Sequence, residues 1–390
     1  MKYMMMLKIT LLIPKVSNHP KTQVKLNEPH TQSQTITKIK KMKRQISLLT
    51  LATTALFVLS FVMISSCTKT GPEGPSGKDG EDGLNADATC VKCHDFSDDL
   101  LTKVHQFANS AHGSGANVDR SGEGCAQCHT SQGFRLMVDS GQIAAVTSPA
   151  IINCRTCHKI HETYSPADYA LRGSGAVAMV MGGPAAEYNY GTSNTCANCH
   201  QGRAVTPYPV AGGDPVQVTN KRYGPHYGPQ ANMFIGKGAY EIAGPMPYSN
   251  SPHTQAVTNG CVTCHMDGAP VGLKAGGHQM SITYNETSKL LTGCTVSGCH
   301  TDAAVVKSMF DANRAEIAAL ELELETELKA MGLLDVEGYV TVPATLTQDQ
   351  LGIILNLKLV HYDHSYGAHN YRYTKALLVN SLDALAKMGV

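Results

Sequence analysis

Residues 46–64, ISLLTLATTALFVLSFVMI, are almost entirely apolar apart from a few Ser and Thr, and they follow the basic residues Lys43 and Arg44. A basic start followed by such a run is the layout of an export signal, so we predict a signal peptide over residues 42–66. An uncleaved membrane anchor is the alternative, because about 20 apolar residues can span a bilayer. Residues 1–41 have no recognisable role ahead of a signal, so we expect translation to begin at Met42 and this extension to be non-native.

The signal ends at Cys67, which follows Ile64-Ser65-Ser66 and so resembles the end of a bacterial lipoprotein signal. On this interpretation Cys67 is lipidated and becomes the mature N-terminus. A glycine then recurs at every third position from residue 71 to residue 83. Five such triplets are too few for a collagen triple helix, so we expect residues 67–87 to form a flexible tether. The folded part is expected to begin at residue 88.

The clearest helical pattern lies near the C-terminus, between Ala303 and Met331. Apolar residues recur there at spacings of three and four, with acidic residues between them: Ile317, Leu320, Leu324, Leu328 and Met331. This periodicity predicts a helix that begins after Asp302 and ends before Gly332. We expect it to pack against a second helix over residues 348–361, although a dimerisation face is the alternative. A further amphipathic helix is predicted to begin at His369.

The composition between these segments favours irregular loops and a core that is not made of protein alone. The 390 residues include no Trp and seven Phe, but 36 Gly and 18 Pro. This is a poor supply of large side chains, so we expect bound cofactors to fill part of the interior. The formal net charge of +1 gives no indication of a nucleic-acid partner. The predicted fold class is mainly α with extensive irregular loops.

The spacing of the cysteines indicates which cofactor the chain binds. Ten of the 13 fall in five Cys-x-x-Cys-His units: Cys90/Cys93/His94, Cys125/Cys128/His129, Cys154/Cys157/His158, Cys196/Cys199/His200 and Cys261/Cys264/His265. Two thiols at this spacing can add to the two vinyl groups on one edge of a haem, and the next residue can bind the iron. Zinc knuckles and redox dithiols also use Cys-x-x-Cys, but neither requires a histidine after each pair. We therefore expect covalent haem at each attachment unit, as we call these motifs.

A sixth attachment unit is predicted at LTGCTVSGCH, where four residues separate Cys294 from Cys299 and His300 follows at once. A disulfide is the alternative. The histidine directly after the second cysteine favours haem, and the longer spacer resembles a known variant in multihaem cytochromes. The prediction is six haem c groups held by residues 88–302.

Each iron has a second axial position, opposite the proximal histidine that ends the attachment unit. Nine histidines remain between residue 88 and the C-terminus, so methionine ligands are not required. Six are favoured as distal ligands because they lie in Gly/Pro-bounded turns, near attachment units, or at a predicted helix start: His112, His161, His226, His253, His278 and His369. His105 is a reserve candidate. His361 and His364 are expected to be surface groups or groups that contact a ligand. Residues 303–390 are thus predicted to be a C-terminal helical region that supplies one distal ligand.

Several segments resemble multihaem c-type cytochromes of the nitrite reductase and hydroxylamine oxidoreductase lineage. They are FANSAHGSG, GCAQCHTSQGF, NCRTCHKIH, YGPHYGPQANMF, GCVTCHM and VHYDHSYGAHNYRYTKALL, spread over residues 88–390. The resemblance implies a mainly helical fold around stacked haems, with long C-terminal helices. The chain departs from the lineage because none of its attachment units ends in Lys, as the nitrite-reducing haem of the family does.

The expected function is electron transfer by six haems with two histidine ligands each, at the outer membrane, on its periplasmic or cell-surface side. The expected partners are other redox proteins, such as cytochromes and quinol-linked membrane oxidoreductases, or extracellular acceptors, with the membrane contacted through the lipid anchor. No catalytic residue is predicted. The alternative is an enzyme acting on small nitrogen or sulfur compounds at one open haem. A third reading is a homo-oligomer or filament in which a spare histidine, His105 or His361, binds a neighbour's haem.

Overall fold

The computed structural model describes residue 94 and residues 98–267, 274–284, 288–295 and 299–389. The chain divides into two compact units, Met1–Asp82 and Gly83–Val390, and every described residue belongs to the second. The predicted signal peptide, Cys67, the tether, Cys90 and Cys93 lie outside the described residues. In the part that is described, no helix has the length and apolar character needed to cross a membrane.

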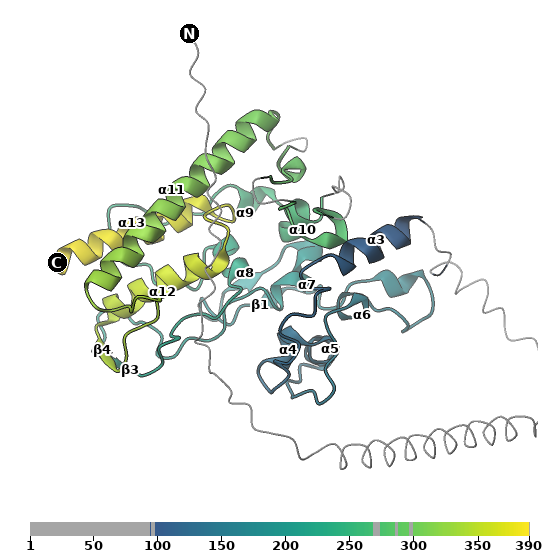
Figure 1. The fold of residues 1–390 in the computed structure, drawn as a ribbon, viewed down its shortest axis with the longest axis horizontal. Helices are drawn as coiled ribbons and strands as arrows, with labels where there is room; N and C mark the ends of the chain where they lie inside the picture. The colour runs from purple at the N-terminus through teal and green to yellow at the C-terminus, as the bar shows by residue number, and fades with distance from the viewer. Residues whose placement is uncertain (1–93, 95–97, 268–273, 285–287, 296–298, 390) are drawn as a thin grey trace, which may run out of the picture. The chain divides into compact units, whose positions relative to one another are not determined.

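Helices of very different length make up most of the regular structure (Figure 1). The α-helices are α3 (Asp98–Ala108), α4 (Ala126–His129), α5 (Ser131–Ser140), α6 (Cys154–Cys157), α7 (Asn194–Ala197), α8 (Gln230–Ile235), α9 (His253–Ala256), α10 (Gly260–His265), α11 (Ala303–Ala330), α12 (Gln348–Asp363) and α13 (Tyr371–Lys387). Four short 3₁₀ helices accompany them: η1 (Pro166–Tyr169), η2 (Gly191–Ser193), η3 (Gly277–Gln279) and η4 (Thr292–Cys294). The described part of the chain is therefore helix-rich with long irregular connections, as the sequence predicted.

Strands occur as two small antiparallel ribbons. β1 (Val177–Ala178) pairs with β2 (Glu187–Tyr188), and β3 (Val216–Val218) pairs with β4 (Ala344–Leu346). The second ribbon joins residues far apart in the sequence, with Val216 opposite Leu346. It thereby ties the middle of the chain to the connection between α11 and α12.

The main protein core lies where α11, α12 and α13 pack side by side (Figure 1). On α11, Ile317, Leu324 and Leu328 are fully buried, and they follow the spacing that predicted the helix. Most of α12 is buried on every side, because α8, α11, α13 and β4 all contact it. This region has an ordinary aliphatic core, so the shortage of large side chains concerns the rest of the domain.

The start of α13 differs from the prediction. The helix begins at Tyr371, not at His369, because the backbone of Asn370 is not helical (φ −160°, ψ 78°) and its buried amide makes tertiary hydrogen bonds. The side-chain oxygen of Asn370 accepts from the backbone N–H of Ser251 at 2.8 Å, and its nitrogen donates to the carbonyl of Phe234 at 3.2 Å. His369 is thus held in the turn before the helix, next to α9 and α8.

Candidate haem-binding site

Each proximal histidine lies opposite one histidine from another segment of the chain. Their ring centres are 6.0–6.3 Å apart. The pairs are His94–His161, His112–His200, His129–His226, His158–His278, His253–His300 and His265–His369. The six partners are the six histidines that the sequence favoured as distal ligands, and each faces a different proximal histidine.

This spacing is that of two imidazoles on opposite sides of one metal ion. With metal–nitrogen bonds of about 2.1 Å and about 1.1 Å from each nitrogen to its ring centre, the ring centres are about 6.4 Å apart. The angles between the ring planes vary from 27° for His94–His161 to 85° for His253–His300. Direct ring stacking would favour a particular angle, so the common feature of the six pairs is the separation and not the orientation.

A continuous cavity of about 1890 Å³ connects most of these pairs, and members of five of the six line it. Neither His94 nor His161 is among its lining residues. The volume exceeds the roughly 300–1,000 Å³ of an ordinary small-molecule pocket. Nine of the attachment-unit cysteines also line it: Cys125, Cys128, Cys157, Cys196, Cys199, Cys261, Cys264, Cys294 and Cys299. The cavity therefore has room and reactive thiols for several large ligands.

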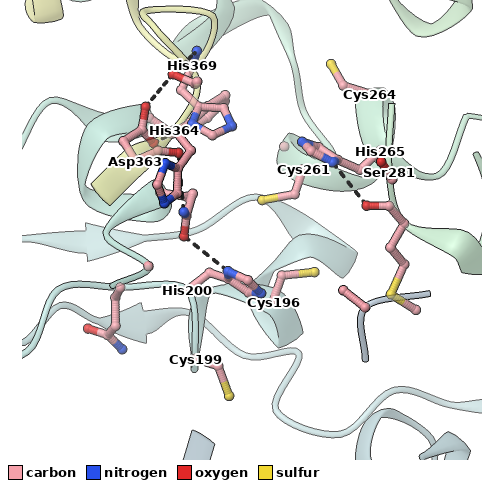
Figure 2. A pocket seen from close by; sticks show the side chains of 18 of the residues that line it. Cys196, Cys199, His200, Cys261, Cys264, His265, Ser281, Asp363, His364 and His369 are labelled. Carbon is pink, nitrogen blue, oxygen red and sulfur yellow. Dashed lines mark hydrogen bonds and ion pairs between the residues drawn. The ribbon is translucent and has the colours of Figure 1, made fainter. Parts of the chain in front are cut away.

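Thiols of different attachment units lie close together. Cys128 and Cys199, Cys196 and Cys261, and Cys264 and Cys294 are near enough to shift the pKa values of each other's thiols. In Figure 2 the thiols of Cys196 and Cys199, which belong to one attachment unit, point in different directions.

The units at His129, His200, His265 and His300 thus form a contiguous series. The thiol of Cys157 is close enough to affect the pKa values of both Cys196 and Cys199. This places the unit at His158 beside the same series.

Burial lowers the pKa of six of the paired histidines, His112, His129, His226, His253, His265 and His278, and so favours the neutral form that binds a metal. Desolvation, with a smaller effect of the facing His200, lowers the pKa of His112 to about 4. Desolvation and the facing His369 likewise lower the pKa of His265 to about 4. His369 is the exception. Burial opposes its charged form, but the charge and hydrogen bond of Asp363 outweigh burial and raise its pKa.

The Nδ1 atoms of several paired histidines have hydrogen-bond partners, which orients the rings. Nδ1 of His369 lies 2.6 Å from a carboxylate oxygen of Asp363, whose side chain is 1% exposed (Figure 2). Nδ1 of His158 lies 2.7 Å from the carbonyl of Tyr169, and Nδ1 of His200 lies 3.1 Å from Oε1 of Gln230. A proton donated from Nδ1 leaves the lone pair of Nε2 free for a metal.

Met280 contacts histidines of two different pairs. Its carbonyl lies 3.2 Å from Nδ1 of His265, and its sulfur lies 3.3 Å from Nδ1 of His112. Neither Met280 nor Asp363 was singled out in the sequence. The only available signal was their position next to histidines, in HQM and HYDHS.

The charges around the cavity are strongly unequal. Six cationic side chains line it: Arg120, Arg203, Arg222, Lys289, Arg314 and Arg372. Among its lining residues the one carboxylate is that of Asp363, which is engaged with His369. A cavity with this lining favours ligands that carry negative charge.

The remaining three histidines are arranged differently. His105 lies exposed on α3, seven residues before His112. His361 lies with Nδ1 2.8 Å from Glu321, and its ring centre is 6.0 Å from that of His364. These two residues are only three positions apart at the C-terminal end of α12, so, unlike the six pairs, they do not join segments that are far apart in the sequence. In the described part of the chain, no group of three or more His, Cys, Asp or Glu side chains forms a metal site.

Comparison with known proteins gives limited similarity. No family model and no curated protein matches the chain. One similar solved structure is the outer cell wall cytochrome OcwA, with a TM-score of 0.47 and 18% identity over 72% of this chain and 49% of that one. Another is an undecahaem cytochrome from the S-layer of Carboxydothermus ferrireducens, with a TM-score of 0.41 and 17% identity over 77% of this chain and 45% of that one. The chain matches about half the length of each.

Proposed function

We propose that the chain is a multihaem c-type cytochrome that transfers electrons through six covalently attached haem c groups, each bound by two histidines. The observation that carries this proposal is that all six proximal histidines face a histidine partner at 6.0–6.3 Å. Bound haem supplies reversible one-electron oxidation and reduction of its iron. The chain's own residues would attach each haem through thioether bonds, bind its iron on both sides and line the space around it.

The proposed roles follow the arrangement of the pairs. The thioether bonds are assigned to Cys90, Cys93, Cys125, Cys128, Cys154, Cys157, Cys196, Cys199, Cys261, Cys264, Cys294 and Cys299. The proximal ligands are His94, His129, His158, His200, His265 and His300. The distal ligands are His161, His226, His278, His112, His369 and His253, in the same order. In this proposal His105, His361 and His364 bind no iron.

The residues around the cavity fit haem in three ways. The volume is sufficient for several macrocycles, the thiols lie at its wall, and the cationic lining complements the two propionates that each haem carries. The small number of large aromatic residues in the chain also agrees with macrocycles filling the interior around α4 to α10.

Electron transfer is favoured over catalysis because two histidines per iron leave no open position for a substrate. Every attachment unit ends in histidine, so the lysine-ligated haem of the nitrite reductases has no counterpart here. The closeness of thiols from different units, which is sufficient for them to shift one another's pKa values, supports electron transfer because neighbouring attachment sites lie together. We extend the proposal to an exported lipoprotein, anchored through Cys67 at the outer membrane, that exchanges electrons with other redox proteins or extracellular acceptors.

Two measurements on the mature protein test the proposal. Intact mass should show six haem groups, and the fully reduced protein should bind no carbon monoxide. Replacing His112 with Ala should open one iron in six to carbon monoxide, because the ring facing His200 is removed. Replacing His105 with Ala is the matched control and should open none, since that ring is exposed on α3.

Fewer than six haems would contradict the assignment of the attachment units. Stoichiometric binding of carbon monoxide by the unaltered protein would contradict electron transfer as the sole role, and would favour an enzyme with one open haem.

A further inference from the structure

The loop from His161 to Tyr164 has a conformation that its residues do not favour. The φ angle is +65° at His161 and +53° at Tyr164, in the left-handed region that residues other than glycine rarely adopt. All four loop residues are exposed, so packing against a core does not hold them in place. A strained backbone persists only where other interactions over-determine it. Some other group must therefore fix this loop.

The carboxylate of Asp168 is that group. It is 5% exposed and lies in η1, just after the loop. One of its oxygens accepts from the backbone N–H of His161 at 2.8 Å and from that of Tyr164 at 3.1 Å. The other accepts from the backbone N–H and the hydroxyl of Thr163, both at 2.8 Å. A single buried carboxylate thus bonds both strained residues and Thr163, one of the two residues between them.

The held loop sets the position of the His161 ring. The ring of Tyr164 stacks on it with centres 5.5 Å apart and planes 11° apart. The centre of the His94 ring is 6.1 Å from that of the His161 ring. Neither His161 nor His94 is among the residues that line the large cavity. The contacts described for the His161 residue are those of the loop itself, with Asp168 and Tyr164.

We propose that Asp168 is a positioning residue that holds His161 as the distal ligand of the haem attached at Cys90 and Cys93. The inference rests on the proposed function, because it takes His94 and His161 as ligands of one iron. Without the carboxylate, three backbone N–H groups lose their acceptor and the loop relaxes out of the left-handed conformation. The His161 ring then leaves the axial position.

A second charged contact in the same loop offers a competing explanation. Glu162 pairs with the buried guanidinium of Arg172, which also bonds Asp139 at 2.7 Å. Glu162 does not bond the N–H groups of the two strained residues. Replacing Glu162 with Gln should therefore leave the ligation unchanged, whereas replacing Asp168 should not.

The experiment compares full-length mature variants by spin state and by carbon monoxide binding. D168A should convert one haem in six from low spin to high spin in the oxidised protein, and should bind one carbon monoxide per molecule when reduced. D168N should do so in part, because its amide oxygen can accept from some of the donors. Added imidazole should restore the low-spin spectrum of both variants, which a general loss of folding would prevent.

Asp335→Ala is the matched control. Asp335 also fixes a loop, accepting from the N–H groups of Glu337 and Tyr339 at 2.9 Å each, but that loop holds no paired histidine. This variant should remain fully low spin.

The H161A variant distinguishes a failure of the role proposed for Asp168 from a failure of the proposed ligand set. If H161A opens one iron while D168A and D168N stay fully low spin, the role of Asp168 is refuted and the proposed ligand set stands. If H161A opens no iron, His161 is not a ligand, and both the assignment of that pair and this inference fail.

Discussion

Replacing Asp363 with Asn should raise the reduction potential of one haem in six. The buried carboxylate of Asp363 lies 2.6 Å from Nδ1 of His369, and its other oxygen accepts from the hydroxyl of Ser365. A carboxylate that takes up the Nδ1 proton increases the donor strength of the imidazole, which stabilises the oxidised iron. The other Nδ1 contacts of the six pairs described above reach carbonyl, amide or thioether groups. The haem between His265 and His369 is therefore expected to have a lowered potential.

The size of the shift follows from the strength of the contact. A hydrogen bond to a charged group contributes about 1.5–3 kcal/mol. If about half of this differs between the oxidised and reduced states, the potential rises by roughly 30–65 mV, since about 59 mV corresponds to a tenfold change for one electron. Asn keeps the shape of the side chain and removes the charge, so the variant isolates the electrostatic part.

A spectroelectrochemical titration of the mature protein measures this shift. The six-haem curve should change by one component in six, while the haem count stays constant. Glu321→Gln is the control, because Glu321 makes the same kind of contact at 2.8 Å with His361, which we assign to no iron. An unchanged D363N titration, or an equal shift in E321Q, would refute the reasoning.

Two further predictions concern the helical core. Leu324→Ala should lower the free energy of unfolding by about 2–5 kcal/mol because Leu324 is fully buried on α11, whereas Leu322→Ala should change it by less than about 0.5 kcal/mol because Leu322 is 64% exposed. Denaturant unfolding measures both, and equal losses would show that α11 is not packed as described. The second concerns Glu316, whose pKa is held below its ordinary value of 4.5 by Lys375 and Tyr371 on α13. A lowered carboxyl pKa stabilises the fold above the unfolded pKa, so E316Q should cost about 0.2–1 kcal/mol at pH 7, given the exposure of this ion pair. The difference should disappear as the pH falls from 4.5 through the lowered pKa of Glu316, and a difference that persists below it would contradict the assignment.

The six histidines that face a proximal histidine are those that the sequence favoured as distal ligands, and the grounds for favouring them were local features. His112 lies in a turn beyond the end of α3, whereas His105 lies within the exposed helix, so only His112 is free of the helical backbone. His226 adopts a positive φ in a turn bounded by Gly224, Pro225 and Gly228. His161 also adopts a positive φ, but it was favoured because it follows the proximal His158 by three residues. Turns can direct a side chain away from the local backbone, and the sequence carries that information.

The partner of each histidine could not be predicted in the same way. His112 precedes the unit at His129 but faces His200, and His253 precedes the unit at His265 but faces His300. Both skip the attachment unit next to them in the sequence. Pairing depends on which segments the tertiary fold brings together, and no spacing rule along the chain encodes this.

The region around the cavity and the region around α11–α13 differ in the interactions that can stabilise them. Around the cavity, α4, α6, α7, α9 and α10 have only four to six residues each. Isolated helices shorter than about 12 residues are marginal in water. Each histidine pair joins segments that are far apart in the sequence. Binding of both histidines to one haem iron would therefore cross-link this region at six points. Around α11–α13, by contrast, a continuous aliphatic core needs no cofactor.

Protein produced without haem attachment should therefore lose its short helices and keep its long ones. Limited proteolysis of this apoprotein should cleave between residues 98 and 200 and leave a resistant fragment that contains residues 303–389. The haem-loaded protein is the control and should resist cleavage in both regions. If the apoprotein protects both regions equally, the short helices are stable without ligation, and the histidine pairs do not hold that part of the fold. If it protects neither, the aliphatic core is insufficient alone, and haem binding organises the whole domain.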